Sequence, residues 1–315
     1  MSDQILLSIC IPTFNRVDYV KKALENITNQ AGFDHRVEIV ISDNCSTDNT
    51  REVVMDFQRR FSNIVYHRND QNLLDKNFII ALSHGRGEYL KMLNDTAVIK
   101  PGALEEILGI IQANIERRPV LFFANGTGKS YEEIKRIKGL NQFVKEASFY
   151  ITWILTFGIW KDHFNEIENQ YEGIELSLVQ SVLLFKCVIK CQHANLYSKE
   201  YFQVPEVRNK GGYNLVNVFV GNYLGKILLP YYQHGEISGF TYRHEKLKLL
   251  RYFLLPWGIE ILKSDSDYRF AVKGSMKTLL VYYWKYPIFY LLLIYLTYRV
   301  SRNWLSGHLQ KKKSG

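Results

Sequence analysis

Cysteine is scarce in this chain, and the few cysteines are not arranged for disulfide or zinc chemistry. The 315 residues contain four, Cys10, Cys45, Cys187 and Cys191, with no Cys-x-x-Cys pair and no histidine cluster at zinc spacing. These spacings argue against a disulfide framework and a zinc ribbon, and they favour reduced thiols in a cytoplasmic protein. The stretch from Met1 to Gln4 is polar, so we expect no signal peptide.

Acidic residues are scarce in the last fifth of the chain. Residues 251–315 hold eleven Lys and Arg against three Asp and Glu, which accounts for +8 of the net charge of +9. A solvated basic tail would explain residues 311–313 alone, because the other basic residues flank an apolar and aromatic run. No RNA- or DNA-binding motif is present, so nucleic acid is not an expected partner.

What the sequence has in abundance is short apolar runs that alternate with segments of helical spacing. The strand-like runs are 5–11, 37–42, 63–67, 89–93 and 120–124, and the helical segments are 17–30, 50–61, 75–83 and 103–115. Strands and helices that alternate at short intervals favour parallel pairing with helical connections. The sequence therefore predicts an α/β fold with a mostly parallel central sheet flanked by helices on both faces.

The pattern changes along the chain and predicts three regions. Residues 1–250 form the main domain, with a first half at 1–125 and a second half at 126–250, and residues 251–315 form a helical C-terminal extension. In the second half the sequence predicts a loop at 127–147, a helix from Glu175 to Cys187 and another helix at 213–230.

Polar side chains stand at the ends of three predicted strands. Thr13 and Asn15 follow the first strand, Asp43 the second and Asp95 the fourth. In open α/β sheets, ligands bind outside the carboxyl ends of the strands, and converging carboxylates are unfavourable there unless solvent or a ligand offsets their charge. We therefore predict that Asp43 and Asp95 bind a charged ligand, whereas Asp48 is expected to cap a helix.

Three ordered blocks carry a resemblance to a known family. They are LSICIPTFNR, VEIVISDNCSTDNT and GEYLKMLNDTAVIKPGAL, and they lie within residues 5–125. They resemble the signature blocks of family-2 glycosyltransferases, which have the A-type glycosyltransferase fold, a Rossmann-like nucleotide-sugar-binding fold. A later segment, NKGGYNLVNVF, is similar to the branch that builds bacterial surface polysaccharides such as capsule and O-antigen. The resemblance implies transfer of a sugar from a nucleotide sugar to an acceptor hydroxyl, usually with inversion.

The resemblance also implies roles for individual residues. The turn from Pro12 to Arg16 would wrap the nucleotide, Asp43 would accept a hydrogen bond from the base, commonly uracil, and Asp95 would lie by the ribose and diphosphate. The residues implied in nucleotide-sugar binding are Pro12, Thr13, Asn15, Arg16, Asp43, Asn72, Lys76, Asn94 and Asp95. A UDP-sugar is accordingly the expected donor.

The sequence departs from the family's Asp-x-Asp motif, which binds Mn²⁺ or Mg²⁺ on the diphosphate. The corresponding positions are Asn94, Asp95 and Thr96, so Asp95 is the only acid and Thr96 replaces the usual second carboxylate. A divalent cation can take its remaining oxygens from water and phosphate. Two alternatives stay open: weak metal binding at Asp95, or basic residues that meet the leaving-group charge without a metal. The candidate basic residues are Lys76, Lys100, Arg208, Lys210 and Arg243.

The general base is a second departure. The family places a Glu-Asp pair before a late helix, and the matching stretch QYEGIELSLVQSVLL keeps Glu172 but has Gly173 in place of the second acid. Glu175 follows one helical turn later, and either Glu172 or Glu175 could deprotonate an acceptor hydroxyl as the catalytic residue. The alternative is an acid that only stabilises the first turn of a helix through the helix dipole.

The C-terminal extension contains a run of bilayer length. Leu279 to Tyr298 is apolar and aromatic, but Lys285 and Pro287 interrupt it. Aromatic residues with basic flanks are typical of a segment in the headgroup region of an anionic leaflet. We expect residues 278–304 to bind the membrane surface, peripherally on the inner face of the cell membrane. A transmembrane span and a buried or homo-oligomer contact are the alternatives.

Two functional hypotheses follow. The first is an enzyme, a membrane-associated bacterial glycosyltransferase that moves a sugar from a nucleotide sugar to a lipid-linked oligosaccharide acceptor. The second is a catalytically degenerate domain that binds a nucleotide sugar, or serves as a scaffold of a polysaccharide assembly complex. It is suggested by Thr96 and Gly173, which stand where acids are usual. Turnover with a lipid-linked acceptor would separate the two hypotheses.

Overall fold

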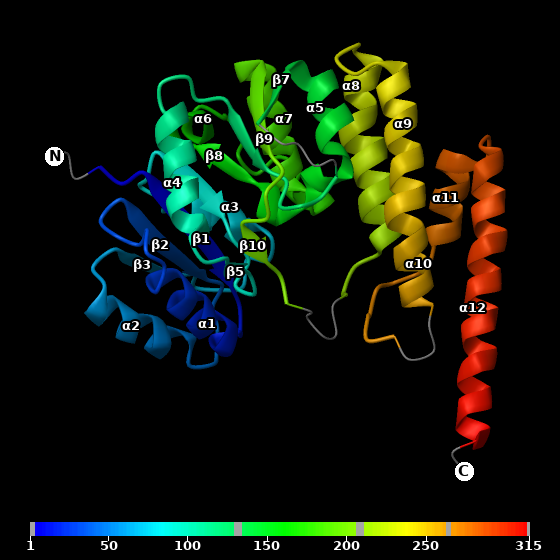
Figure 1. Ribbon diagram of the computed structural model, residues 1–315, viewed down its shortest axis with the longest axis horizontal. Coiled ribbons are helices and arrows are strands. Elements are labelled where there is room, and N and C mark those ends of the chain that lie inside the picture. Colours follow the sequence, from blue (N-terminus) through cyan, green and yellow to red (C-terminus); the bar gives the residue numbers. More distant parts are fainter. Residues whose placement is uncertain (1–3, 129–133, 206–210, 263–265, 314–315) are drawn as a thin grey trace. The chain divides into compact units, whose positions relative to one another are not determined.

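The computed structural model describes residues 4–128, 134–205, 211–262 and 266–313, with the side chains of the last helix described as far as Arg302 (Figure 1). The chain divides into two compact units, Met1–Pro205 and Glu206–Gly315. The boundary that we predicted after residue 250 therefore lies inside the second unit, within a continuous helical stretch. The functional division at that residue stays a prediction.

The first unit is built on a five-stranded sheet in the order β3-β2-β1-β4-β8. Its strands are β1 (Leu7–Thr13), β2 (Val37–Asp43), β3 (Ile64–Arg68), β4 (Tyr89–Met92) and β8 (Gly158–Trp160). The first four are parallel, and β8 closes one edge antiparallel to β4. The predicted α/β class with a mostly parallel sheet is confirmed.

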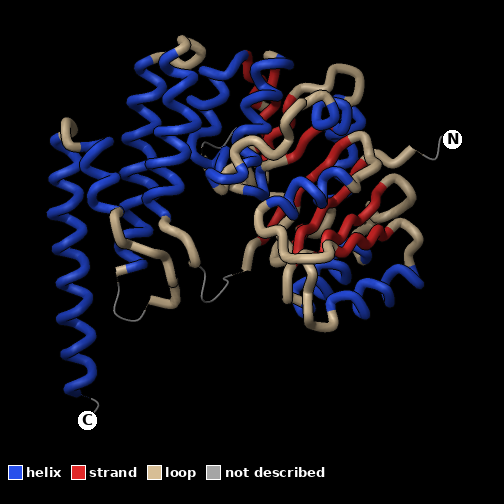
Figure 2. Tube along the Cα trace, turned by 180° about the vertical axis from the view of Figure 1, so that it is seen from behind, coloured by secondary structure: helices blue, strands red, loops and turns tan. Residues whose placement is uncertain are grey.

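Side chains of the sheet alternate between two layers of helices, as the period of two in a strand requires. Ile9 and Ile11 of β1 join one apolar cluster with residues of α1, α2 and α4, while Cys10 between them is buried outside that cluster. The buried residues of α3 also lie outside it, so helices cover both faces (Figure 2). The helices are α1 (Val17–Thr28), α2 (Thr50–Arg60), α3 (Lys76–Ser83) and α4 (Ala103–Asn114).

A smaller sheet in the order β6-β9-β7 completes the first unit. Its strands are β6 (Val120–Phe123), β9 (His193–Tyr197) and β7 (Lys135–Lys138), and a short ladder joins β5 (Val98–Ile99) to β10 (Phe202–Gln203). The helices are α5 (Gly139–Ala147), α6 (Lys161–Asn165) and α7 (Val179–Cys191). The loop predicted at 127–147 is wrong for its described part, because β7 and α5 lie there. Buried apolar residues recur at helical spacing from Leu140 to Ala147, a signal that the preceding charges obscured.

The second unit consists of helices. A helix with π-type hydrogen bonds, η4 (Asn217–Leu228), continues into α8 (Leu229–Gln233), and α9 (Gly239–Leu249) continues through η5 (Leu250–Leu254) into α10 (Leu255–Ile261). The last two helices are α11 (Ser275–Tyr283) and α12 (Pro287–Lys313). The helix predicted at 213–230 is confirmed.

The apolar C-terminal run is divided between these last two helices. α11 ends at Tyr283 and α12 begins at Pro287, a residue that suits the first position of a helix and disrupts a helix interior. Over the part of the chain that the structure describes, every helix is too short or too polar to cross a bilayer.

A buried lysine anchors the strand that leads to the predicted ligand-binding edge. Lys91 of β4 is 2% exposed, and its Nζ donates to the carbonyl oxygens of Met92 at 3.0 Å, Leu155 at 2.6 Å and Phe157 at 2.8 Å. Burial lowers the pKa of Lys91 to about 7. The side chain thus ties the end of β4 to the segment before β8, four residues ahead of Asp95.

The lowered pKa of Lys91 predicts a pH dependence of stability. An unfolded lysine keeps its proton up to about pH 10.4. Between about pH 7 and 10 the unfolded chain therefore holds a proton on this lysine that the folded chain has released, and the contribution of Lys91 to the free energy of unfolding rises with pH. We expect this slope to approach about 1.4 kcal/mol per pH unit and to be missing in Lys91→Met. Denaturant titrations of both proteins across that range measure it, and equal slopes would contradict the assignment.

Candidate functional site

The carboxyl ends of β1, β2 and β4 meet at one edge of the central sheet. β1 lies between the other two strands, with Thr13 opposite Asp43 and Cys10 opposite Met92. The backbone N–H of Leu93 continues the pairing by donating to the Cys10 carbonyl at 3.0 Å. This arrangement brings the polar residues that follow the three strands to one edge, as the sequence predicts.

Asp95 is held by two residues of the first turn. Thr13 Oγ1 donates to Oδ2 of Asp95 at 3.0 Å, and a guanidinium nitrogen of Arg16 donates to Oδ1 at 3.1 Å. Burial raises the pKa of Asp95, while the charge of Arg16 and the hydrogen bonds from Thr13 and Arg16 act in the opposite direction. The side chain of Arg16 is 45% exposed against 5% for Asp95. Arg16 therefore connects a buried carboxylate to the surface, where it can meet a second anion.

Asp43 is buried, and each of its two carboxylate oxygens accepts one hydrogen bond. Its Oδ1 accepts from the backbone N–H of Ser46 at 2.9 Å, and its Oδ2 accepts from the Tyr66 hydroxyl at 2.6 Å. Arg68 Nε lies 3.8 Å from the same Oδ2, and burial together with the hydrogen bond to Asp43 raises the pKa of Tyr66. Tyr66 and Arg68 were not predicted as site residues. The feature that would have identified them is the register of β3 against β2, which places Arg68 directly opposite Asp43.

The turn from Pro12 to Arg16 is fixed against the loop after β2. Asn15 has a positive φ of 52°, a conformation that asparagine tolerates better than most residues. Its backbone N–H donates to Ser46 Oγ at 2.8 Å, and its Oδ1 accepts from the Thr47 N–H at 2.7 Å. Phe14, next to it, is 40% exposed, so the turn presents an aromatic ring to solvent.

Asp48 has the capping role that the sequence predicts. Its Oδ2 accepts from the backbone N–H of Val17, the first residue of α1, at 2.9 Å, and its Oδ1 accepts from the N–H of Thr50, the first residue of α2, at 3.1 Å. One carboxylate therefore satisfies donors at the N-termini of two helices.

An amide network positions the predicted residues of the next loop. Asn72 Oδ1 accepts from Asn44 Nδ2 at 2.7 Å, and Asn44 Oδ1 in turn accepts from Asn69 Nδ2 at 3.0 Å. Asn44 and Asn69 are buried and were not predicted. Lys76 is exposed at the start of α3, so this loop offers a cation next to a rigid amide cluster.

The Asn94-Asp95-Thr96 loop does not form a protein cage for a divalent cation. Asp95 is its only acid, both carboxylate oxygens have partners, and Arg16 places a positive charge 3.1 Å from Oδ1. Within the described ranges, no group of three or more His, Cys, Asp and Glu side chains is arranged to hold a metal ion. A Mn²⁺ or Mg²⁺ ion at this loop would depend on phosphate and water for most of its ligands.

The two candidate bases differ in their surroundings. Glu172 is paired with Lys186, whose Nζ lies 2.5 Å from Oε2. Glu175 is exposed in a 3₁₀ turn, Ile174–Leu176, and its carboxylate has no hydrogen-bond or ion-pair partner among the residues that the structure describes. The prediction that the helix starts at Glu175 is wrong, because α7 begins at Val179. A positive φ of 56° at Ser177 separates Glu175 from this helix. α7 has no acid in its first turn, so a dipole role in that turn is excluded for both glutamates.

The basic residues predicted as metal substitutes are scattered. Lys100 is paired with Glu200, and Arg243 belongs to α9 of the second unit. Arg208 and Lys210 lie outside the described residues. Among the predicted site residues of the first unit, Arg16 is the cation that the structure joins directly to Asp95.

Comparison with known proteins gives consistent matches. The sequence profile of Glycosyl transferase family 2 matches residues 8–203. Abequosyltransferase RfbV of Salmonella typhimurium is 35% identical over 136 residues, which cover 42% of this chain and 39% of RfbV. GalNAc(5)-diNAcBac-PP-undecaprenol beta-1,3-glucosyltransferase of Campylobacter jejuni is 34% identical over 104 residues, 32% of this chain and 33% of that protein. The match thus spans well under half the length of each relative.

Among solved structures, S. aureus TarS residues 1–349 in complex with UDP align with a TM-score of 0.50 at 19% identity, over 82% of this chain and 79% of that one. At this identity the likeness shows the fold alone, an α/β fold of the A-type glycosyltransferase kind. The profile match covers more than half of the chain and contains the three blocks noted in the sequence except for Leu7, the first residue of the first block. The chain therefore belongs to glycosyl transferase family 2.

Proposed function

We propose that this protein transfers a sugar from a UDP-sugar to a hydroxyl of a lipid-linked glycan in the synthesis of a bacterial surface polysaccharide, with inversion at the transferred sugar. The observation that carries this function is the joining of Asp95 to Thr13 and Arg16 beside Asp43, at the edge where open α/β sheets bind ligands. TarS, solved with UDP, supports the donor. The Campylobacter relative, named for an undecaprenol-linked glycan, supports the acceptor.

We assign Asp43 as the residue that binds the uracil base of the donor. A carboxylate has about four lone-pair sites, and Ser46 and Tyr66 use two of those of Asp43. The remaining sites can accept an N–H of uracil, and the exposed ring of Phe14 directly follows Thr13, the residue paired with Asp43 in the sheet. Asn72 and Lys76 would complete the nucleotide pocket, with Pro12 and Asn15 lining the turn and Asn94 beside the ribose.

We assign Arg16 as the residue that binds the diphosphate and offsets its negative charge. The guanidinium has five N–H donors, of which the structure uses one on Asp95, and it can hold a phosphate in the two-pronged geometry that arginine favours. In this assignment Arg16 stabilises the leaving UDP as negative charge develops on it. Asp95 is then a positioning residue that sets the direction of the guanidinium.

The general base is assigned to Glu175 rather than Glu172. The Glu172 carboxylate is engaged by Lys186, whereas that of Glu175 is exposed and without a partner among the described residues. Glu175 would accept the proton of the acceptor hydroxyl while the hydroxyl oxygen attacks the anomeric carbon of the donor sugar and UDP departs.

The second unit is assigned to membrane association on the cytoplasmic face. Trp284, Leu291 and Ile294 are each more than half exposed, and residues 266–302 carry six basic residues against one acid. Such a surface is typical of proteins that bind anionic headgroups, and it would bring the enzyme to a lipid-linked acceptor. A homo-oligomer contact through the same surface is the alternative use of these side chains.

A second candidate function is a nucleotide-sugar-binding scaffold without catalysis. It is favoured by the single acid of the Asn94-Asp95-Thr96 loop and by Gly173 beside Glu172. Retained UDP binding with no turnover of any UDP-sugar on lipid-linked acceptors would favour it over the enzyme.

The proposal that Asp43 binds the uracil base predicts the effect of Asp43→Asn. The substitution keeps the shape of the side chain but replaces an acceptor oxygen by an amide donor. We expect UDP affinity to fall about tenfold or more, since a hydrogen bond to a charged group contributes about 1.5–3 kcal/mol. Isothermal titration calorimetry measures it. Tyr66→Phe is the matched control, because it leaves the carboxylate in place, and an unchanged Kd in Asp43→Asn would rule out the assignment.

The assignment of Arg16 predicts binding of UDP without metal. In a thermal-shift panel of UDP, GDP and CDP, each with Mn²⁺ or with EDTA, UDP should raise the melting temperature in both conditions. Arg16→Gln should lose most of the shift, and Arg16→Lys, which keeps the charge but not the fork of donors, should retain part of it. A shift that requires Mn²⁺ in the unsubstituted protein would show that the metal, not Arg16, meets the diphosphate charge.

The proposal that Glu175, and not Glu172, is the general base predicts different effects of two matched substitutions. Glu175→Gln should lower kcat by about 10²–10⁴-fold with little change in donor KM, as loss of a general base does. Glu172→Gln removes only an exposed ion pair and should leave kcat within a few-fold. Release of UDP in the presence of a lipid-linked acceptor measures both, and the opposite ranking would move the base to Glu172.

A further inference from the structure

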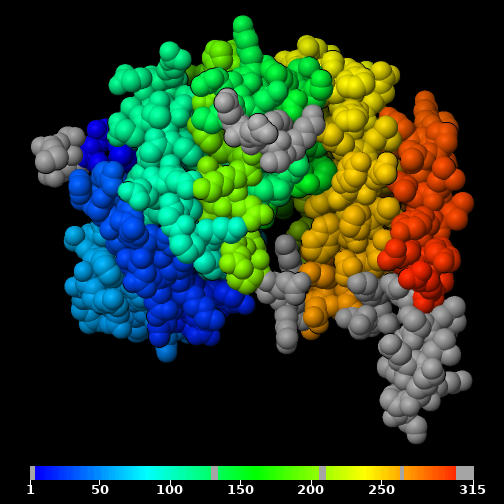
Figure 3. All heavy atoms as spheres, in the orientation of Figure 1, coloured from blue at the N-terminus to red at the C-terminus, as the bar shows by residue number. Residues whose placement is uncertain are grey.

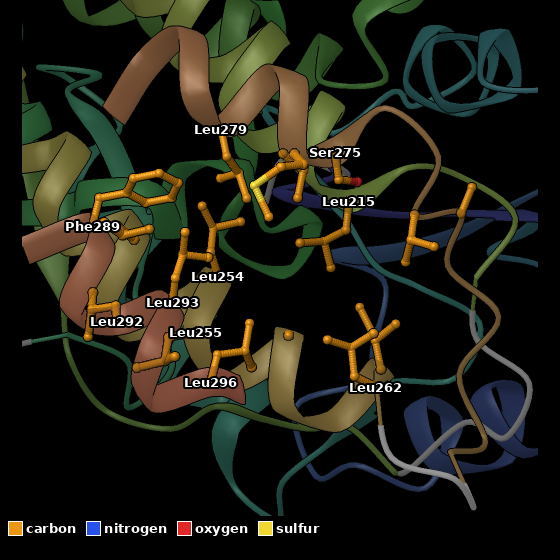
Figure 4. Close-up of a pocket in the computed structure, with 17 residues that line it drawn as sticks. Leu215, Leu254, Leu255, Leu262, Ser275, Leu279, Phe289, Leu292, Leu293 and Leu296 are labelled. Atoms are coloured by element: carbon orange, nitrogen blue, oxygen red, sulfur yellow. The ribbon is translucent and has the colours of Figure 1, made fainter. Parts of the chain in front are cut away.

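The second unit contains an apolar pocket with a volume of about 250 Å³. η5 and α10 line one side of it, and α11 and α12 line the other (Figure 4). Leu254, Leu255, Leu262, Leu279, Leu293 and Leu296 point into it, and among the described residues that line it Ser275 alone has a hydroxyl. The pocket lies wholly within one compact unit.

Hydrogen bonds hold the walls of this pocket in place. Thr278 Oγ1 of α11 donates to Asn217 Oδ1 of η4 at 2.9 Å, and the buried Tyr283 hydroxyl donates to the Lys246 carbonyl of α9 at 2.9 Å. Ser275 Oγ donates to Asn214 Oδ1 at 3.2 Å, so the hydroxyl is already satisfied. The described lining of the pocket is therefore held in place and offers a ligand an almost entirely apolar surface.

The mouth of the pocket is open and basic. Leu262, Val272 and Met276 line the pocket and are 47%, 56% and 50% exposed. In the sequence Lys273 follows Val272 and Lys277 follows Met276, and both lysines are exposed. Figure 3 shows the side chains of α11 and the first part of α12 at the surface of this unit. An apolar interior thus opens beside two ammonium groups.

The size and lining of the pocket restrict its occupant. Water in a cavity needs two to four polar partners, and an apolar cavity of about 150 Å³ stays dry and binds benzene. At 250 Å³ the pocket exceeds that cavity, but it is smaller than the roughly 300–1,000 Å³ of sites for drug-sized ligands. A sugar or nucleotide would leave its polar groups unsatisfied there. A single hydrocarbon chain fits both the volume and the lining.

We propose that this pocket takes one hydrocarbon chain of an anionic membrane lipid, whose head group lies at Lys273 and Lys277. The lipid is a constituent of the leaflet, and its chain leaves the bilayer to enter the pocket. Such a contact holds the protein by a specific site in addition to surface adsorption of its aromatic residues. It does not depend on the sugar-transfer chemistry of the first unit.

Gly258 of α10 provides a matched pair of variants. It lines the pocket, and a Cβ added there would lie 3.6 Å from both methyl carbons of Leu296, an ordinary contact. Gly258→Leu would fill part of the pocket, whereas Gly258→Ala adds only the Cβ. Both replace glycine in a helix by residues with higher helix propensity, so both variants are expected to fold.

The test uses the full chain without nucleotide, bound to phosphatidylcholine vesicles that contain phosphatidylglycerol with a photoactivatable group in one acyl chain. After irradiation, mass spectrometry locates the label and gives its amount per vesicle-bound protein. We expect label in residues 250–262 and 271–296 of the unsubstituted protein and of Gly258→Ala, and about tenfold less in Gly258→Leu, because each buried methylene contributes strongly to binding. Charge-removing Lys273→Gln/Lys277→Gln should lower the label as well.

Several results would overturn the proposal. Equal labelling of Gly258→Leu and Gly258→Ala, or label confined to the outer faces of α11 and α12, would place the lipid outside the pocket. Labelling by a free photoactivatable fatty acid but not by the vesicles would identify a soluble ligand. A concentration-dependent dimer without lipid label would assign the pocket to a second copy of the chain. Loss of sugar transfer in other variants affects none of these readouts.

Discussion

The contact of Asp95 with Thr13 and Arg16 is the interaction on which the rest of the site depends. A buried carboxylate is unfavourable without partners, and here burial raises its pKa while Arg16 and Thr13 counteract the shift. Thr13 is the last residue of β1 and Arg16 lies in the turn that follows, and both reach Asp95 because β1 pairs with β2 on one side and with β4 on the other. The same pairing puts Asp43 beside them. Strand order therefore fixes which charges meet at the ligand edge.

Much of the fold and part of the site could be predicted because they depend on local sequence. Apolar runs that end in polar residues gave the strands and placed Asp43 and Asp95 at their carboxyl ends, and the position of Asp48 before a helical segment indicated a cap. Tyr66 and Arg68 could not be found in this way, because their contact with Asp43 depends on the register between β2 and β3. The joining of Arg16 to Asp95 likewise spans 79 residues of sequence.

Other errors come from backbone conformation and from the balance of charge against apolar spacing. The positive φ at Ser177 separates Glu175 from α7, and no residue type in that stretch requires it. The charged residues before Gly139 led us to predict a loop over a segment that contains the amphipathic helix α5. In the second unit, Pro287 marks the break between α11 and α12 in the sequence itself, whereas the pocket that they line depends on packing between helices distant along the chain.

The central claim is that a nucleotide binds at the edge formed by Asp43, Asp95 and Arg16, with the guanidinium in place of a metal cage. A crystal structure of the complex with UDP in the presence of EDTA tests it most directly. The account predicts the uracil ring within hydrogen-bond distance of the Asp43 carboxylate and the diphosphate against the Arg16 guanidinium. UDP bound away from this edge, or a diphosphate that leaves Arg16 on Asp95 alone, would contradict it.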